Sequence, residues 1–377
     1  MLSWVGEKRL LFGRFRKTGS ALAAGCLAAL ITNITPAAAP AVSSALPGPP
    51  LVGFSFSPFS VPRLLNETPT AALQTLVDRL QPDLVRLPIY WSQAQPWPDA
   101  FDFSSTDALL AIIRKHNRHL RRPTRVVFAV GARNLGYPEV YLPGWLARAQ
   151  GNNLKKIVAT PAYATYLRTV VDHYAQLPEL YAWQVENEPL DSVTTNIDHA
   201  PALSTTTVDN EIDAVRAGDR SHPIVVTTFN SSHIKLDKEG SSPLAWLYRL
   251  LPGPKAVGHP AETLQLGDAL GLDVYVVTPS TPLAEDPAEE RIAWKSDTII
   301  YWSTQARLAN KQLWITEMQG IPWLGAPGFT SQDLVDSASA YRDRGASVVL
   351  LWGVESWLFN GEWMDAGLRA INTLRSP

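Results

Sequence analysis

Short runs of apolar, often β-branched residues recur along the chain from Leu51 onward, and longer amphipathic stretches separate them. Several runs are apolar at consecutive positions, as in Val348-Val-Leu-Leu-Trp352, rather than at alternate ones. That pattern is typical of parallel strands covered on both faces. The predicted strands are Leu51–Ser57, Leu84–Pro88, Arg125–Gly131, Tyr181–Asn187, Ile224–Thr228, Leu272–Val277, Gln312–Glu317 and Ser347–Gly353.

The stretches between these strands have the hydrophobic spacing of helices. Examples are Thr70–Leu80, Thr106–His116, Ala162–Tyr174, Val208–Ala217 and Ser331–Arg344. Repeated strand-then-helix units predict a single-domain (β/α)8 barrel, a TIM barrel, over residues 51–377. An open, doubly wound sheet is the alternative, but the Gly-rich first turn typical of that fold is replaced by Ser55-Phe-Ser-Pro-Phe59. Extended loops at the barrel mouth are expected at Leu135–Trp145, Asn230–Gly267 and Thr278–Ala293.

The first fifty residues have a different pattern. Five basic residues lie between Lys8 and Lys17, the uncharged stretch Ala21–Ile34 follows, and small residues and prolines occupy Pro36–Ala41. This order is typical of a secretory signal. We therefore expect residues 1–41 to be a signal peptide, with a membrane anchor as the alternative, and residues 42–50 to be a linker. The expected location is outside the cell or in the periplasm or cell envelope, with membrane contact only if the segment is retained.

Composition narrows the chemistry and the partners. Lys and Arg together number 33 against 35 Asp and Glu, so the chain lacks the basic field that attracts nucleic acid. Its one cysteine, Cys26, lies inside the predicted signal, which excludes thiol chemistry and Cys-ligated zinc from the mature protein. The histidines are scattered, and no Gly-x-Ser-x-Gly elbow is present. We expect no metal, no organic cofactor, no nucleic acid and no protein partner.

Carboxylates close two of the predicted strands. Trp183-Gln-Val-Glu-Asn-Glu-Pro189 ends the fourth strand at Glu188, and Trp314-Ile-Thr-Glu-Met-Gln-Gly320 ends the seventh at Glu317. The C-terminal strand ends of such a barrel face the active-site mouth, so the two glutamates are expected across it from each other. Glycoside hydrolysis uses such a pair as acid and nucleophile, about 5–5.5 Å apart when configuration is retained. Glu186 is expected one layer deeper, in a structural role.

These motifs resemble the clan A retaining glycoside hydrolases, closest to the cellulase group, glycoside hydrolase family 5, over Leu51–Ser376. The resemblance implies that Glu188 is the general acid/base and Glu317 the nucleophile. It also implies that five residues near the strand ends contact the substrate or the nucleophile. Arg86 and Tyr275 orient the nucleophile, Asn187 binds the sugar 2-hydroxyl, Trp352 forms the floor of the subsite before the cleaved bond, and Trp91 belongs to the substrate-binding loop after the second strand.

Elementary electrostatics assigns the two glutamates different tasks. A guanidinium and a phenol hydroxyl stabilise the ionised form of Glu317, whereas burial and the second carboxylate are expected to raise the pKa of Glu188. Two positions depart from the family 5 pattern. The third strand closes with Gly131-Ala-Arg-Asn134 instead of a histidine, and the sixth reads Asp273-Val-Tyr275 instead of His-x-Tyr. These departures leave the sugar and the exact family open.

The sequence thus predicts an exported glycosidase that hydrolyses O-glycosidic bonds of a β-linked glycan or glycoside by double displacement. A non-catalytic carbohydrate-binding barrel and a transglycosylase with the same residues are the alternatives. Glu355, after the last strand, either touches substrate or lies in a solvated loop. Thirteen tryptophans are many for a chain of this size, and flat indoles stack on sugars. Six are expected as sugar platforms at the mouth: Trp91, Trp97, Trp145, Trp323, Trp352 and Trp357.

Overall fold

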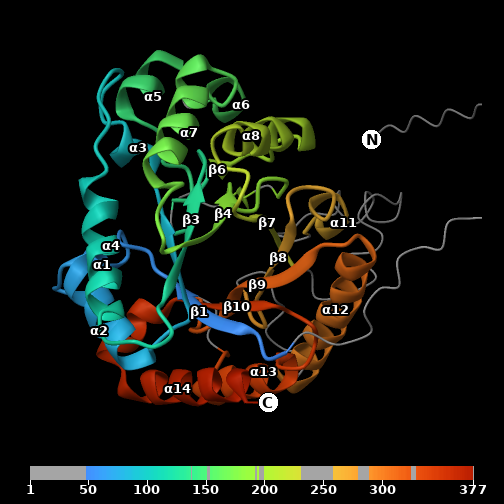
Figure 1. Cartoon of the computed structure of the whole chain (residues 1–377). Coiled ribbons are helices and arrows are strands. Elements are labelled where there is room, and N and C mark those ends of the chain that lie inside the picture. Colours follow the sequence, from blue (N-terminus) through green and yellow to red (C-terminus); the bar gives the residue numbers. More distant parts are fainter. Residues whose placement is uncertain are drawn as a thin grey trace, which may run out of the picture. The chain divides into compact units, whose positions relative to one another are not determined.

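The computed structural model describes residues 48–136, 138–150, 153–191, 193–194, 199–230, 258–278, 288–323 and 328–376, all within one compact unit. Parallel strands close into a barrel in the order β1-β10-β9-β8-β7-β4-β3-β2 (Figure 1). The eight strands are β1 (Leu51–Ser55), β2 (Leu84–Pro88), β3 (Arg125–Val130), β4 (Leu180–Val185), β7 (Ile224–Phe229), β8 (Ala269–Val274), β9 (Gln312–Gln319) and β10 (Val348–Trp352). The predicted (β/α)8 barrel is therefore confirmed.

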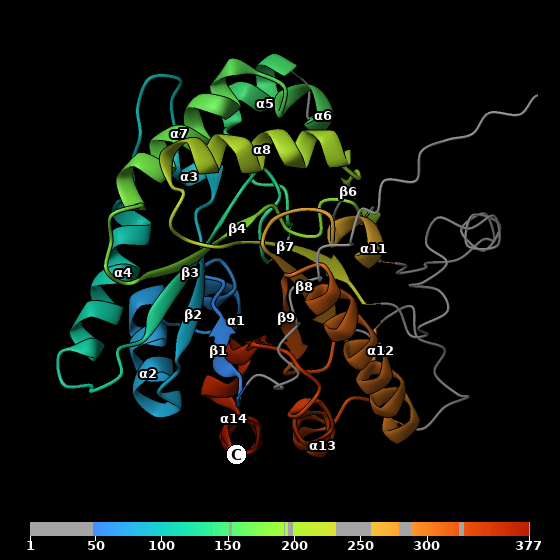
Figure 2. The same cartoon turned by 45° about the vertical axis from the view of Figure 1, so that its right-hand side comes forward.

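Helices follow every strand and surround the barrel (Figures 1 and 2). They are α1 (Val61–Leu64), α2 (Pro69–Leu80), α3 (Trp91–Ala94), α4 (Ser104–Asn117), α5 (Gly144–Gln150), α6 (Leu154–Ile157), α7 (Pro161–Tyr174), α8 (Thr205–Gly218), α11 (Pro260–Thr263), α12 (Ala288–Leu308), α13 (Ser331–Tyr341), the 3-10 helix η1 (Val354–Phe359) and α14 (Gly361–Arg375). A short hairpin, β5 (Val193–Thr194) and β6 (His199–Ala200), follows β4. Among the described helices, none has the length and apolar character needed to cross a membrane.

The predicted strands match the observed ones closely, and β8 shows the largest shift. It begins at Ala269, three residues before the predicted start, and includes Gly271. A Cβ at Gly271 would lie 2.8 Å from Thr316 Oγ1, so this glycine marks close packing inside the barrel rather than a turn. Helix α12 begins at Ala288, inside the predicted loop 278–293. The predicted loop 135–145 is described apart from residue 137. Residues 231–257 of the predicted loop 230–267, the predicted signal peptide and most of the linker lie outside the described residues.

The inside of the barrel is filled in two layers. The lower layer is apolar and consists of Leu84, Val127, Ala182, Val225, Ala269, Trp314, Val348 and Leu350. Side chains alternate along a strand, so the next inward position lies two residues toward the C-terminal end. On four strands those positions hold the fully buried polar residues Arg86, Gln184, Thr227 and Thr316, whereas β3 and β8 have Ala129 and Gly271 there. The strand sequences therefore place a polar layer directly under the barrel mouth.

An irregularity in β9 adds one residue at the same level. Against β8, Leu272 pairs with Ile315 but Asp273 pairs with Glu317, and against β10 the register also slips past Ile315. One extra residue in a strand is a β-bulge, which changes where the following side chain points. Because of the bulge, Thr316 and Glu317 both reach Asp273 or Arg86 at the top of the barrel.

Candidate active site

The chain leaves β4 in an unusual backbone conformation. Glu186 and Glu188 both have positive φ angles, 59° and 44°, a region that residues with side chains rarely adopt. The backbone N–H of Glu188 donates to Thr227 Oγ1 at 2.8 Å, which holds this turn against β7. Strained backbone of this kind persists only where the surroundings fix it, and it concentrates at functional sites.

Glu317 receives a donor on each carboxylate oxygen. Arg86 Nη2 lies 2.5 Å from Oε1, and the Tyr275 hydroxyl donates to Oε2. Arg86 is fully buried and Glu317 is 5% exposed, so little water competes for these contacts. Charge-assisted hydrogen bonds in such a setting stabilise the ionised carboxylate strongly. Burial, followed by the charge of Glu317, raises the pKa of the Tyr275 hydroxyl well above its usual value, which keeps it a donor.

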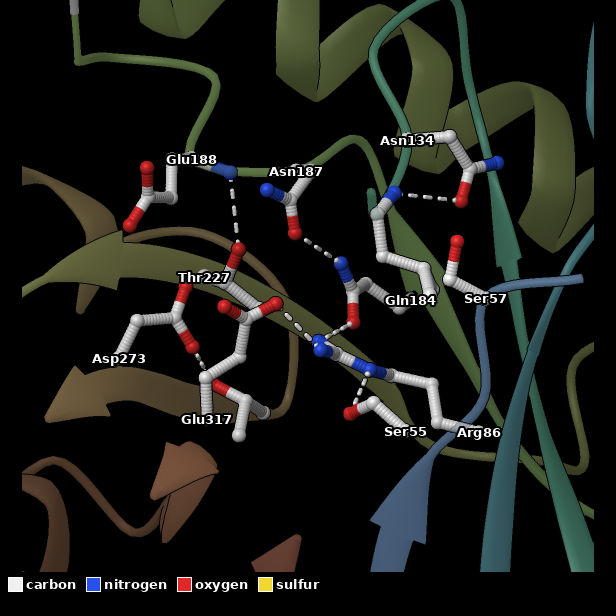
Figure 3. Close-up of polar contacts among 12 residues, drawn as sticks. Ser55, Ser57, Arg86, Asn134, Gln184, Asn187, Glu188, Thr227, Asp273 and Glu317 are labelled. Atoms are coloured by element: carbon white, nitrogen blue, oxygen red, sulfur yellow. Dashed lines mark hydrogen bonds and ion pairs between the residues drawn. The ribbon is translucent and has the colours of Figure 1, made fainter. Parts of the chain in front are cut away.

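Gln184 links the arginine to the fourth strand end. Arg86 Nη1 donates to Gln184 Oε1 at 2.7 Å, and its Nε donates to Ser55 Oγ at 2.9 Å. Gln184 Nε2 in turn donates to the side-chain oxygen of Asn187 at 3.1 Å. Figure 3 shows this chain of contacts running from Ser55 across Arg86 to Asn187. The amide orientation of Asn187 is fixed by it, so the nitrogen of that amide remains available as a donor at the mouth.

Glu188 has a different electrostatic environment from Glu317. It is 9% exposed and makes no ion pair with a described residue. Burial, followed by the charge of Asp273, raises the pKa of the Glu188 carboxyl well above its usual value. Smaller contributions in the same direction come from Asp191, Glu139 and Glu317. Glu188 therefore retains a proton at pH values at which a carboxyl of ordinary pKa has lost it.

A pocket of about 530 Å³ adjoins the site at Ser55, the hydrogen-bond partner of Arg86, and neither Glu188 nor Glu317 lines it. Its walls come from the segments after β1, β3, β9 and β10, and they include Ser57, Leu135, Trp323, Trp352 and Glu355. The indoles of Trp323 and Trp352 stack, with ring centroids 5.0 Å apart and an interplanar angle of 23°. A mainly apolar pocket with a few buried polar groups is typical of a small-molecule or sugar site.

Trp91 does not face this pocket. It is fully buried, its ring packs against Tyr163 and Tyr166 of α7, and its indole N–H donates to Gln95 at 2.9 Å. The short helix α3 begins at Trp91 and turns its side chain outward toward α7. The predicted sugar contact at Trp91 is therefore wrong, and the residue belongs to the core.

The other predicted platforms divide in the same way. Trp357 is buried and donates to the carbonyl of Gly320 at 3.0 Å, whereas half-buried Trp145 donates to the carbonyl of Gln95. Trp97 is 63% exposed and does not line the pocket. Trp323 and Trp352 are the tryptophans that line it among the described residues. The excess of tryptophan thus serves mainly the core, because an indole fills volume as readily as it stacks on a sugar.

Glu186 differs in part from its prediction, and burial of Glu355 removes one of the two alternatives for that residue, the solvated loop. Glu186 is structural, as predicted, but it does not point deeper into the barrel, because its positive φ turns the carboxylate toward Tyr163 of α7 and the backbone N–H groups of Ala132 and Arg133. Glu355 is 4% exposed rather than solvated, and its carboxylate accepts from the backbone N–H of Ser57. Burial raises the pKa of Glu355 to about 7.

The roles of Gln184 and Asp273 at the top of the barrel were not predicted from the sequence. Gln184 carried a usable signal, because it lies two residues after the small inward-facing Ala182 and therefore points into the barrel. The role of Asp273 could not be found in this way, since it depends on the β9 bulge that brings Glu317 beside it. The described residues contain no cluster of three or more His, Cys, Asp and Glu side chains placed to hold a metal ion.

Solved structures of family 5 glycoside hydrolases share the fold of this chain. A GH5_18 protein from Streptomyces cattleya, in complex with GlcNAc, superposes with a TM-score of 0.56 at 18% identity, over 81% of this chain and 70% of that one. Endo-glycoceramidase II from a Rhodococcus species, captured as a lactosyl-enzyme intermediate, gives 0.50 at 16% identity, over 81% and 73%.

An exo-β-1,4-mannosidase, Op5Man5 from Opitutaceae bacterium strain TAV5, gives a TM-score of 0.51 at 17% identity, over 86% of this chain and 59% of that one. No protein-family model and no curated protein sequence matches the chain. At these identities the likeness establishes the barrel fold, and the chemistry is argued from the site itself.

Proposed function

We propose that this chain is a glycoside hydrolase that cleaves O-glycosidic bonds of a β-linked glycan or glycoside with retention of configuration. The observation that carries the proposal is the contrast between two glutamates at the ends of β4 and β9. Glu317 is paired with Arg86 and accepts a hydrogen bond from Tyr275, whereas Glu188 keeps its proton because it is buried among acids. Such a difference between two carboxyls separates the nucleophile from the acid.

In the first step, a Glu317 oxygen attacks the anomeric carbon while Glu188 donates its proton to the departing glycosidic oxygen. The carbon–oxygen bond to the leaving group breaks, and its electron pair stays on that oxygen. In the second step, Glu188 accepts a proton from water, the water oxygen attacks the same carbon, and Glu317 is released. Two displacements at one carbon give net retention.

The substrate contacts follow from the side chains beside the pair. We assign Trp352 to stacking on the sugar ring before the cleaved bond, because it lines the pocket and packs edge-to-face with Tyr275, with ring centroids 5.6 Å apart. Asn187 is assigned to a sugar hydroxyl, since Gln184 fixes its amide. Structural neighbours were solved with Manβ1-4GlcNAc and as a lactosyl-enzyme intermediate, which makes β-linked mannosides, glucosides and galactosides the first substrates to test.

We also propose that residues 1–41 direct export and are removed. The order of basic, apolar and small residues in the sequence supports this. Expression of the full chain in a secreting host, followed by N-terminal sequencing of the product, tests it. A mature end near Ala41 is expected, whereas recovery of the intact chain in the cytoplasm would contradict export.

The enzymatic proposal is tested with Glu188→Gln and Glu317→Gln, assayed on aryl β-glycosides. Each should lower kcat/KM by about 100-fold or more. For Glu188→Gln the reason is that general acid catalysis supplies about that much, and for Glu317→Gln it is that the nucleophile is lost. Glu188→Gln should retain more activity on a dinitrophenyl glycoside, whose leaving group needs no proton. Glu179→Gln is a matched control, since Glu179 precedes β4 at the opposite end of the barrel. Full activity in either active-site variant would overturn the assignment.

A further inference from the structure

Asp273 is a third buried acid in the site, and the mechanism above does not use it. It lies in β8 and is fully buried. Its Oδ1 accepts a hydrogen bond of 2.6 Å from the Thr316 hydroxyl. Its Oδ2 is also buried, and within the described part of the chain no group makes a hydrogen bond of standard geometry with it. A buried carboxyl oxygen left in this way is costly unless another group shares a proton with it.

The position of Asp273 supplies such a group. Figure 3 shows Asp273 between Glu188, at the end of β4, and Glu317, in β9. Asp273 is the strongest charged influence on Glu188, and Glu317 is the strongest charged influence on Asp273. Three carboxyls therefore interact with one another. The guanidinium of Arg86 pairs with only one of them, Glu317.

The remaining charged and titratable neighbours do not replace this partner. Those that act on Glu188 or Asp273 from the surrounding elements are Asp191, Glu139, Arg133, Arg86, Glu317 and Tyr275. Asp191 is held by His259 at 2.6 Å, and Arg133 is bound to Glu139 at 2.9 Å. Like charges this close cannot all ionise, so one proton remains on Glu188 and Asp273 together.

We propose that Glu188 and Asp273 form a carboxyl pair that shares one proton, and that Asp273 is the positioning residue that keeps this proton available to Glu188. The proposal rests on the proposed function of Glu188 as the acid/base. In the first displacement the shared proton leaves with the glycosidic oxygen, and in the second the pair regains one proton from water. No other group of the protein gains or loses a proton, and Asp273 does not contact the reacting atoms.

The pair differs chemically from the family 5 pattern that the chain resembles, because one of its two members replaces a histidine. Asp273 occupies the first position of Asp-Val-Tyr275, where that pattern has a histidine. A protonated histidine beside Glu188 would favour its ionised form, whereas a second carboxyl favours its protonated form. The pair therefore extends the activity of Glu188 as an acid toward higher pH.

The test is Asp273→Asn, which keeps the size of the side chain and an acceptor for Thr316 but cannot ionise. The basic limb of the pH profile of kcat/KM should move to lower pH by about one unit or more, as expected for loss of a close acid. At neutral pH, activity on a poor leaving group such as a methylphenyl β-glycoside should fall about tenfold or more. Activity on a dinitrophenyl β-glycoside should change much less, because that leaving group needs no proton.

Asp219→Asn is the matched control. Asp219 is also buried, but it bonds Trp183 and His222 at the far end of the barrel, so its pH profile should match that of the wild type. An equal loss for both leaving groups with an unchanged pH profile in Asp273→Asn would show a merely structural role and would overturn the proposal.

Infrared titration of the protonated carboxyl band tests the pair without turnover. The difference spectrum between the wild-type protein and Glu188→Gln should contain a protonated-carboxyl band that persists to high pH, because the variant no longer shares a proton between residue 188 and Asp273. An unchanged band would refute the pair even if Asp273→Asn fails to fold. A changed band in a protein that turns over no glycoside would refute the proposed function and leave the pair intact.

Discussion

Glu188 and Glu317 have the same side chain, and the residues around them give the two carboxyls opposite tendencies. Glu317 has a buried arginine and a phenol as donors, whereas Glu188 has acids as its nearest charged neighbours. The identity of both glutamates was predictable from the sequence, because each follows an apolar strand in a recognisable motif. The acids around Glu188 were not, since Asp191, Glu139 and Asp273 come from three different segments that meet only in the folded barrel.

At the residue scale, Tyr275→Phe isolates the hydroxyl that donates to Glu317. The variant keeps the ring and its contacts with Trp323 and Trp352, so stability should change by less than about 1.5 kcal/mol, the net value of a typical hydrogen bond. Activity should fall more, by about 10- to 100-fold in kcat/KM, because the lost donor holds the nucleophile. Steady-state kinetics and thermal unfolding measure the two effects.

Tyr341→Phe is the control for that substitution. Tyr341 is equally buried, in α13 on the outside of the barrel, so removal of its hydroxyl should leave kcat/KM unchanged. Wild-type activity in Tyr275→Phe would contradict the role of the phenol.

At the scale of single elements, the strand ends determine what reaches the mouth. Strands with consecutive apolar residues were predictable to within a few residues, because burial on both faces leaves a clear pattern. The β9 bulge and the positive φ angles after β4 were not predictable, since both arise from pairing with neighbouring strands and from Thr227. Helix α3 shows the same limit, because one helical turn was enough to move Trp91 from the mouth to the core.

The two tryptophans at these strand ends should therefore respond differently to truncation. Trp91→Ala should lower the free energy of unfolding by roughly 3–5 kcal/mol, the usual effect of emptying a buried aromatic site. Trp352→Ala should change stability less and raise KM, because its ring lines the pocket. Denaturant unfolding and steady-state kinetics on the two variants check this. A rise in KM for Trp91→Ala alone, with unchanged stability, would restore the sugar contact predicted for it.

At the scale of the whole molecule, the barrel encloses more acids near its mouth than it neutralises, and this links stability to pH. Burial raises the pKa of Glu355 from 4.5 to about 7. Between those values the folded protein holds a proton that the unfolded chain has lost, so stability is highest below the lower value and decreases as the pH rises through the upper one. The composition of the chain does not reveal this, because its total charge is nearly balanced.

Glu355→Gln removes this dependence and keeps an acceptor for the Ser57 N–H. The stability of the variant relative to wild type should therefore increase by up to about 3 kcal/mol between about pH 4 and pH 8, the free-energy equivalent of the pKa shift. Urea unfolding at several pH values measures it. Parallel stability curves for the two proteins would contradict a raised pKa at Glu355.

In the proposed mechanism, Glu317 attacks the sugar and forms a covalent intermediate. The protein should be incubated with dinitrophenyl 2-deoxy-2-fluoro-β-glycosides of glucose, mannose and galactose, which slow the second displacement, and then digested for mass spectrometry. We predict one fluoroglycosyl group per chain on the peptide that contains Glu317, with accumulation lost in Glu317→Gln. Labelling of another residue, or release of dinitrophenol without a labelled peptide, would contradict this role of Glu317.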